Sequence, residues 1–375
     1  MRGFVKKTIK VFIDNEWING NTCINSISDF YERIRAKMAI TKMRSDFVKK
    51  LENEGYSIIT DRRLIDKKTI FFIMDDKFLC DDSVSLEEYK KIFDQRMFLM
   101  GGKLLNYPQT LNFYDYLKNP FYPAVLKNEL ANGGVDKFLI ETREQVEIIK
   151  KFYQDKCRDI NIQELFNSCI FQQYIETPSL YDSYIRVLAA SSGDIMGVSL
   201  RYSNVSFPKK EIVGELEKYF LDSKSSYYLN CKTMFNYYSE GNIIYFNQPG
   251  FSKQKKNILD AHLIDSNNPI IPSDIVDVVT SIMKNCNREL GLICGFDFIM
   301  NKHDNKWYYL ENQSFPAIDE WAQTKNIKIP KSKDLNGYIK YLELDMYARY
   351  EALNLYLSKL LETEENNIKL SKSYN

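Results

Sequence analysis

The stretch GLICGFDFIMNKHDNKWYYLENQSFPAIDE, residues 291–320, carries the clearest fold signal in this chain. Its two apolar runs, residues 292–300 and 307–310, are rich in aromatic and branched side chains. Between them lie the polar, turn-forming residues 301–306. Two β-rich runs around such a turn predict a β-hairpin.

The turn decides which residues of the hairpin face each other. With the turn centred on Asp304, Ile299 faces Tyr309 and Asp297 faces Glu311. Directly opposed residues hold their Cβ atoms about 5 Å apart. The hairpin is therefore expected to bring two carboxylates together.

These carboxylates, with a nearby amide, predict a metal site. Side chains alternate between the two faces of a strand, so Gln313 lies on the same face as Glu311. Two opposed carboxylates repel each other unless a cation lies between them, and Mg²⁺ prefers oxygen ligands completed by water and phosphate. We therefore expect Asp297, Glu311 and Gln313 to bind a metal that holds a phosphate-bearing ligand. The alternative is a surface hairpin with scattered acidic residues.

The composition is that of a soluble globular protein. The chain has 375 residues, of which 44% are hydrophobic and 27% charged, so it is long enough for two or three packed units. The 51 basic and 50 acidic residues leave a net charge of +1. Neither nucleic acid nor an acidic membrane is therefore expected as a partner.

Cysteine and histidine argue against several kinds of site. The seven cysteines are dispersed with no close pair, so neither a zinc site nor a disulfide framework is indicated. The two histidines, His262 and His303, are too few for a multi-histidine metal site. The sequence shows no secretory signal and no run of about 18 apolar residues. We expect a cytoplasmic protein.

The first part of the chain predicts a small α/β domain. Its expected elements are a strand, a helix and two further strands, at residues 8–14, 27–54, 56–60 and 69–74. A strand–helix–strand opening is typical of α/β units. A further helix is expected over residues 85–106.

A phosphate-binding element is predicted around Lys127. This lysine ends the expected strand 122–127, and Gly133 and Gly134 follow before the next strand, residues 138–142. Lysine supplies a point charge, and the glycines let backbone N–H groups approach an anion closely. The alternative is an ordinary hairpin turn with a solvated lysine.

Two arginines lie inside apolar strands. Arg186 belongs to the expected strand 183–190, and Arg201 to the strand 195–202. A buried arginine is costly unless it is paired, and its planar fork matches carboxylate and phosphate groups. A phosphate contact and a structural ion pair with an acidic residue both remain open.

The remaining stretches are less clear. Residues 203–270 predict a helix near 209–220 and a strand near 242–246, within a long, Tyr-rich insertion. A helix over 274–290 leads into the hairpin. The end of the chain predicts a long helix, residues 333–363, and a polar tail, residues 364–375.

The order of these features resembles the ATP-grasp family over about residues 85–325, and is similar to the ribosomal-protein glutamate-adding enzymes within it. The motifs that carry the resemblance are, in order, YPAVLKN with Lys127, NGGVDKFLIET, FQQYI, SYIRV with Arg186, SLRYS with Arg201, and GFDFI with WYYLENQSFP.

The resemblance implies an α/β (α+β) fold in which two α+β lobes clasp ATP. The domains would be an N-terminal α/β domain at 1–84, an ATP-grasp domain at 85–330, and a C-terminal helix with its polar tail at 331–375. The small lobe would cover about residues 110–172, and the large lobe would carry the insertion 203–270.

The resemblance also implies roles for individual residues. The catalytic residues would be Arg186 and Arg201, and the ligands of Mg²⁺ or Mn²⁺ would be Asp297, Glu311 and Gln313. The residues that bind ATP would be Lys127, Gly133, Gly134, Lys137, Gln172, Gln173, Tyr174, Ile175, Glu176 and Asp182.

The sequence departs from the family pattern at several positions. Gln313 stands where the family usually has Asn, Gln173 where it often has Glu, and Tyr184 where it usually has Asp. Either Asp182 or Glu176 would then contact the ribose. The family's first basic residue would be Arg96 or Lys103.

The implied activity is an ATP-dependent carboxylate–amine ligation through an acylphosphate, on an amino acid, a peptide or a peptide side chain, with release of ADP and phosphate. Asp319, Glu320 and Trp321 lie where an amine-bearing substrate would be met. Two alternatives stay open: a kinase of the same fold that acts on a small alcohol or phosphate acceptor, and a nucleotide-binding or interaction protein without catalysis. A homodimer through the N-terminal domain or the C-terminal helix also stays open.

Overall fold

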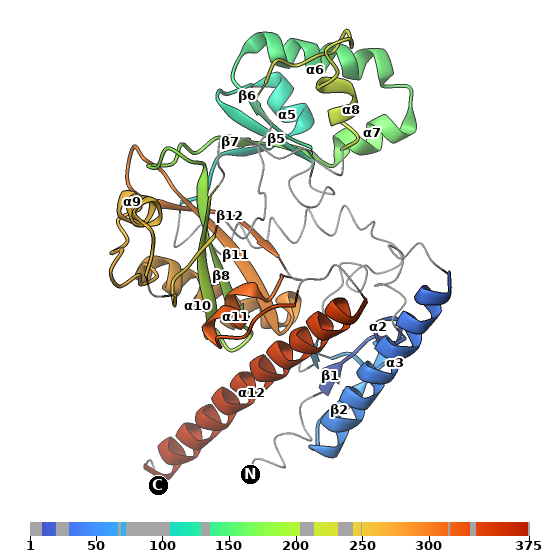
Figure 1. Cartoon of the computed structure of the whole chain (residues 1–375), viewed down its shortest axis with the longest axis vertical. Coiled ribbons are helices and arrows are strands. Elements are labelled where there is room, and N and C mark those ends of the chain that lie inside the picture. The colour runs from blue at the N-terminus through green and yellow to red at the C-terminus, as the bar shows by residue number, and fades with distance from the viewer. Residues whose placement is uncertain are drawn as a thin grey trace.

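Three β-sheets organise the part of the chain that the computed structural model describes (Figure 1). The described residues are 10–19, 30–66, 69–72, 106–128, 136–202, 214–231, 243–248, 250–313, 316–330 and 335–373. A parallel α/β unit is followed by two lobes that each pair an antiparallel sheet with helices. This architecture confirms the α+β fold class predicted from the sequence.

The N-terminal unit contains a parallel sheet in the order β2-β1-β3. Its strands are β1 (Lys10–Phe12), β2 (Ser57–Ile59) and β3 (Thr69–Phe71). After the short helix α2 (Asn15–Ile18), helix α3 (Phe30–Asn53) supplies the crossover that parallel neighbours need. A 3₁₀ turn, η1 (Arg62–Leu64), precedes β3.

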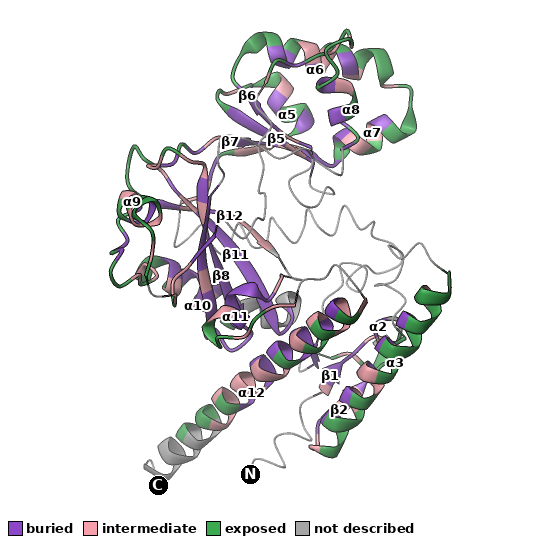
Figure 2. Ribbon diagram, in the orientation of Figure 1, coloured by how far each residue is buried: buried purple, intermediate pink, exposed green. Residues whose placement is uncertain are grey.

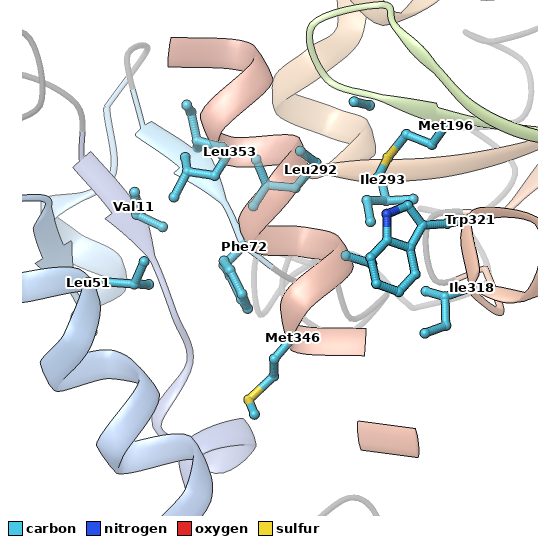
Figure 3. Packing of buried hydrophobic residues seen from close by; sticks show 14 of the residues in the cluster. Val11, Leu51, Phe72, Met196, Leu292, Ile293, Ile318, Trp321, Met346 and Leu353 are labelled. Carbon is cyan, nitrogen blue, oxygen red and sulfur yellow. The ribbon is translucent and has the colours of Figure 1, made fainter. Parts of the chain in front are cut away.

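Helix α12 (Leu335–Ser373) ties the N-terminal unit to the large lobe. One buried apolar cluster contains Val11, Leu51 and Phe72 of the N-terminal unit, Met346 and Leu353 of α12, and Met196, Leu292, Ile293, Ile318 and Trp321 beyond it (Figure 3). The helix continues past residue 363, where the sequence predicted a polar tail. Residues 364–373 contain neither Pro nor Gly, so no residue in this stretch breaks the helix.

The small lobe has an antiparallel sheet in the order β4-β7-β5-β6. Its strands are β4 (Thr110–Asn112), β5 (Ala124–Asn128), β6 (Lys137–Ile140) and β7 (Cys169–Gln173). Helices α5 (Phe113–Lys118), α6 (Arg143–Lys156) and α7 (Ile160–Asn167) close its core. Alternation along β5 places Ala124 and Leu126 in that core, so Lys127 points to the other face.

The large lobe has an antiparallel sheet in the order β10-β9-β8-β11-β12. Its strands are β8 (Ser183–Ala190), β9 (Ile195–Tyr202), β10 (Ile243–Tyr245), β11 (Ile293–Met300) and β12 (Trp307–Gln313). Helices α9 (Lys253–Ala261) and α10 (Ser273–Leu290) pack on one face, and its central strands are buried (Figure 2). The opposite face is approached by α11 (Asp319–Thr324).

The hairpin of β11 and β12 has the predicted carboxylate pair but a different register towards its turn. Asp297 pairs with Glu311, as predicted. The prediction that Ile299 faces Tyr309 is wrong, because Ile299 pairs with Tyr308. Phe298 pairs with Tyr309, so a β-bulge takes up one extra residue of β12 between the two halves of the ladder.

The stretch predicted as one insertion is divided between the lobes. Residues 214–231, with the short helix α8 (Glu217–Phe220), add Leu216, Phe220 and Leu229 to the small-lobe core. Strand β10 returns to the large-lobe sheet. The predicted helix near 209–220 is partly outside the described residues, and within them only residues 217–220 are α-helical.

Among the described residues, no helix is both long enough and apolar enough to cross a membrane.

Candidate nucleotide site between the lobes

A cavity of about 400 Å³ lies where the two lobes meet. The residues that line it come from both lobes and from the segment that connects β7 to β8, here called the connecting segment. They are Pro123, Glu141 and Gln173 of the small lobe, Tyr174, Ile175 and Glu176 of the connecting segment, and Asn301 and His303 of the hairpin turn. Four residues predicted to bind the nucleotide, Gln173 to Glu176, therefore surround one cavity. Pro123, Glu141, Asn301 and His303 were not predicted. Pro123 and Glu141 lie within the motifs YPAVLKN and NGGVDKFLIET but had no role assigned to them, and only packing brings the hairpin turn to the cavity.

The connecting segment is held in place by hydrogen bonds at Tyr174. Its backbone N–H donates to the carbonyl of Pro123 at 3.1 Å, and its hydroxyl donates to Asp182 Oδ1 at 2.8 Å. Burial, reinforced by the Asp182 carboxylate, raises the pKa of Tyr174. The phenol is therefore neutral, and it donates its hydrogen bond to the Asp182 carboxylate.

Glu176 connects this segment to the hairpin turn of the large lobe. Its carbonyl accepts from the backbone N–H of Lys302 at 2.9 Å, and its carboxylate forms an ion pair with the Lys302 side chain. Oε2 also lies 3.4 Å from His303 Nε2. The hydrogen bond from Lys302 lowers the pKa of Glu176, with His303 contributing less. The carboxylate is half-exposed and remains accessible at the rim of the cavity.

Lys127 meets residues of both lobes. Its Nζ donates to Gln172 Oε1 at 2.5 Å and lies 3.9 Å from Glu311 Oε2 of the large lobe. Lys137 stands opposite Lys127 in the β5–β6 ladder. Lys127 follows Pro123 by four residues, a span of about 13 Å along an extended strand. Lys127, Gln172 and Glu311 thus form a row of polar groups at the end of β5 away from the cavity residue Pro123.

Arg186 and Asp297 form a buried ion pair in the middle of the large-lobe sheet. Arg186 Nε and Nη2 donate to the two carboxylate oxygens of Asp297 at 2.7 and 2.6 Å. The residues are 5% and 2% exposed. Burial opposes the charged guanidinium, yet the Asp297 carboxylate outweighs it and raises the pKa of Arg186. Of the two interpretations of Arg186 from the sequence, this geometry favours the structural ion pair.

Arg201 is paired in the same way with Glu320 of α11. Arg201 Nη2 and the Ser199 hydroxyl each donate to Glu320 Oε1 at 2.6 Å. Burial disfavours the ionised carboxyl group, but Arg201 and Arg186 outweigh it and lower the pKa of Glu320. Among the described residues no donor reaches Glu320 Oε2, which is buried. The sequence indicated that a buried Arg201 needs a partner but not which one, because Glu320 lies on a separate element.

Gly197 explains why α11 can approach the sheet so closely. A Cβ atom at this position would lie 2.4 Å from the carbonyl carbon of Glu320. Contacts that short do not occur, so only glycine permits this approach. The position of Glu320 over Ser199 and Arg201 therefore depends on Gly197.

The residues present fit one hard cation better than a preformed metal cage. No group of three or more His, Cys, Asp or Glu side chains within the described ranges could hold a metal ion. Asp297 and Glu311 face each other, but Asp297 already accepts two hydrogen bonds from Arg186. A carboxylate has about four acceptor positions, so Asp297 keeps oxygen lone pairs for a cation that brings its own phosphate and water ligands, and Glu311 faces it in the ladder.

Several predicted residues cannot be placed. Gly133, Gly134, Arg96 and Lys103 lie outside the described residues. The backbone of Gln313 pairs with Gly295, but its side chain is not among those described.

No family model matches the sequence, and no curated protein matches it. Solved structures do resemble the chain. The ATP-grasp ligase PsnB in complex with a minimal precursor shares 10% identity at a TM-score of 0.38, covering 90% of this chain and 78% of that one. The L-amino acid ligase from Bacillus licheniformis shares 13% identity at a TM-score of 0.33, covering 89% and 73%. The macrocyclase MdnC from Microcystis aeruginosa MRC, bound to the precursor peptide MdnA, shares 12% identity at 0.34, covering 83% and 71%.

Proposed function

We propose that this chain is an ATP-grasp enzyme that joins a carboxylate to an amine at the expense of ATP. The observation that carries the proposal is a contact between the two lobes. Lys127 Nζ of the small lobe lies 3.9 Å from Glu311 Oε2 of the large lobe, and Lys127 follows the cavity residue Pro123 by four residues. A cationic side chain beside opposed carboxylates suits a metal-bound triphosphate.

The nucleotide would lie along this row. The base would occupy the cavity beside Gln173 to Glu176, and the half-exposed carboxylate of Glu176 is available to a ribose hydroxyl. Lys127 would exchange its contacts with Gln172 and Glu311 for the phosphates. Gly133, Gly134 and Lys137 would contribute from the segment that follows.

The proposed reaction has two steps. The terminal phosphoryl group of ATP moves to a carboxylate oxygen, and ADP leaves. An amine then attacks the acyl carbon of this acylphosphate, loses a proton, and phosphate departs. Phosphoryl transfer depends mainly on positioning and charge stabilisation, so few acid–base groups are needed. Mg²⁺ held by Asp297, Glu311 and Gln313 would neutralise charge on the phosphate oxygens.

The two arginines would orient the reacting groups. Arg186 uses two of the five N–H donors of a guanidinium on Asp297, which fixes its plane within the sheet. Arg201 is fixed in turn by Glu320. Glu320 Oε2 is where we place the incoming amine, because a buried carboxylate oxygen without a donor among the described residues favours one.

The bidentate Arg186–Asp297 pair favours one alternative, a nucleotide-binding protein without catalysis, because it occupies a predicted metal ligand.

An assay of the purified protein with ATP, Mg²⁺ and a pool of amino acids and short peptides distinguishes these functions. We expect ADP and phosphate to form only when both a carboxylate and an amine are added. ADP without phosphate would indicate a kinase, and nucleotide binding without turnover would indicate the non-catalytic protein.

The nucleotide site itself is tested by calorimetry with MgATP. Lys127→Ala is expected to weaken MgATP binding by at least about tenfold, since one charge-assisted contact contributes roughly 1.5–3 kcal/mol. Lys150→Ala, which removes a lysine of α6 that pairs with Glu147, is the matched control. Unchanged binding in Lys127→Ala would contradict the proposed phosphate site.

A further inference from the structure

Asp136 and Glu217 form a buried, reciprocal hydrogen-bonded latch in the small lobe. Glu217 Oε1 accepts from the backbone N–H of Asp136 at 3.3 Å. Asp136 Oδ1 accepts in turn from the backbone N–H of Glu217 at 3.0 Å. The two residues are only 1% and 2% exposed. Each carboxylate thus fixes the backbone that carries the other.

The second oxygen of each carboxylate extends the latch. Glu217 Oε2 accepts from the backbone N–H of Gly214 at 3.0 Å. Asp136 Oδ2 accepts from Asn128 Nδ2 at 3.2 Å, and the Asn128 backbone N–H donates to the carbonyl of Asp136 at 3.1 Å. The Ser168 hydroxyl donates to Asn128 Oδ1 at 3.0 Å. Both residues that bracket residues 129–135 are therefore held.

The place of the latch in the sequence gives it significance. Asn128 directly follows Lys127 and Asp136 directly precedes Lys137, and these two lysines stand opposite each other in the β5–β6 ladder. Helix α8, which supplies Glu217, comes from the distant segment 214–231 and lies with α6 and α7 in the small lobe (Figure 1). Leu216 and Phe220 beside Glu217 are fully buried in that core, so the anchor is rigidly placed.

The backbone of Asp136 shows that this placement is specific. Its φ angle is +54°, in the left-handed region that most residues avoid. Asp is one of the few residues other than glycine that enter this region, because its short polar side chain bonds locally. Here the side chain bonds to α8 and Asn128. Glu217, through the N–H of Asp136, supports this conformation from outside the loop.

We infer that Glu217 is a positioning residue for the phosphates of ATP. It acts through Asp136 and Asn128 on the neighbouring Lys137 and Lys127, and contacts no reactant itself. The inference rests on the proposed function, in which these lysines bind the phosphates. Neither Glu217 nor Asp136 lines the cavity proposed for the base. The latch should therefore affect the triphosphate and leave the nucleoside alone.

Glu217→Gln is the sharpest test. Glutamine has the same shape but an NH₂ group in place of one oxygen, so that group would face either the Asp136 N–H or the Gly214 N–H, to which it cannot bond. We expect calorimetry to show at least about tenfold weaker MgATP binding, because Lys127 and Lys137 would no longer be held in their binding arrangement before the nucleotide arrives. Adenosine binding should stay within about twofold of the unaltered protein, because its site lacks these residues.

Glu215→Gln is the matched control. Glu215 lies two residues away and forms an exposed ion pair with Lys218, so its change should alter neither affinity. If Glu217→Gln does not fold, Asp136→Asn replaces it, since Asn also tolerates a positive φ and should show the same selective loss.

Three results would overturn the inference, and they differ from one another. Unchanged MgATP affinity in a folded Glu217→Gln protein would show that the latch does not position the phosphates. Equal losses for MgATP and adenosine would show a general structural role. Absence of binding of either ligand to the unaltered protein would refute the proposed function as well.

Discussion

The Arg186–Asp297 ion pair offers a direct test of how the large-lobe sheet tolerates charge at its centre. Asp297→Asn removes one charge while keeping the shape of the side chain. The guanidinium of Arg186, which is 5% exposed, would then lose its bidentate carboxylate at 2.6 and 2.7 Å. A buried charge without its partner is strongly unfavourable.

The magnitude follows from that burial. Breaking one side of a buried ion pair costs about 3–5 kcal/mol, a large part of the roughly 5–15 kcal/mol that stabilises a typical protein. Replacing both partners by apolar residues of similar size, in Arg186→Met/Asp297→Leu, should be close to neutral or stabilising. The double variant should therefore be more stable than Asp297→Asn alone.

Urea unfolding followed by tryptophan fluorescence measures both variants. Trp307 and Trp321 are 4% exposed and report on the large lobe and its junction with α12. Comparison at equal m-value isolates the change in stability. If Asp297→Asn unfolds within about 0.5 kcal/mol of the unaltered protein, or if the double variant is the least stable, the reasoning about this pair is refuted.

Three further changes probe other contacts. Gly197→Ala should destabilise the protein by about 1–3 kcal/mol, because its Cβ would meet the Glu320 backbone at 2.4 Å. It should also reduce turnover in the proposed ligase reaction, and normal turnover would contradict this. Burial lowers the pKa of His262, so the unfolded state takes up a proton at this residue before the folded state does as the pH falls. The free energy of unfolding should therefore decrease below about pH 6.5, by at most about 1.4 kcal/mol per pH unit. An identical dependence of urea unfolding on pH in His262→Gln would exclude this residue as the cause. Lys302→Ala breaks only the half-exposed pair with Glu176, so the urea midpoint should shift by less than about 1 kcal/mol, and a larger shift would show that the turn depends on this pair.

The elements were predictable where local pattern and packing agree. The hairpin 293–313 and the strands of Lys127, Arg186 and Arg201 follow from alternation and turn chemistry alone. The opposition of Asp297 and Glu311 was correct although the assumed turn geometry was not, because the bulge in β12 offsets the shift in the turn. Bulges depend on the neighbouring strand and leave little trace in the sequence.

Partners of buried charges were not predictable, because they come from separate elements. Arg186 finds Asp297 more than a hundred residues later, and Arg201 finds Glu320 on a short helix. The sequence could state only that buried arginines need partners. The latch between Asp136 and Glu217 was missed for the same reason, since the stretch 203–270 gave no indication that part of it packs into the small lobe.

The charge balance of six side chains, here called the inner row, bears on how ATP could bind between the lobes. Three of them are cationic and three are anionic: Lys127, Arg186 and Arg201, with Glu311, Asp297 and Glu320. Their charges cancel, and the two arginines are already paired within it. A triphosphate therefore finds no net positive charge in this row, and Lys137, which stands opposite Lys127 in the β5–β6 ladder, adds one positive charge beside it. A divalent cation beside Asp297 and Glu311 would supply further positive charge to compensate the triphosphate.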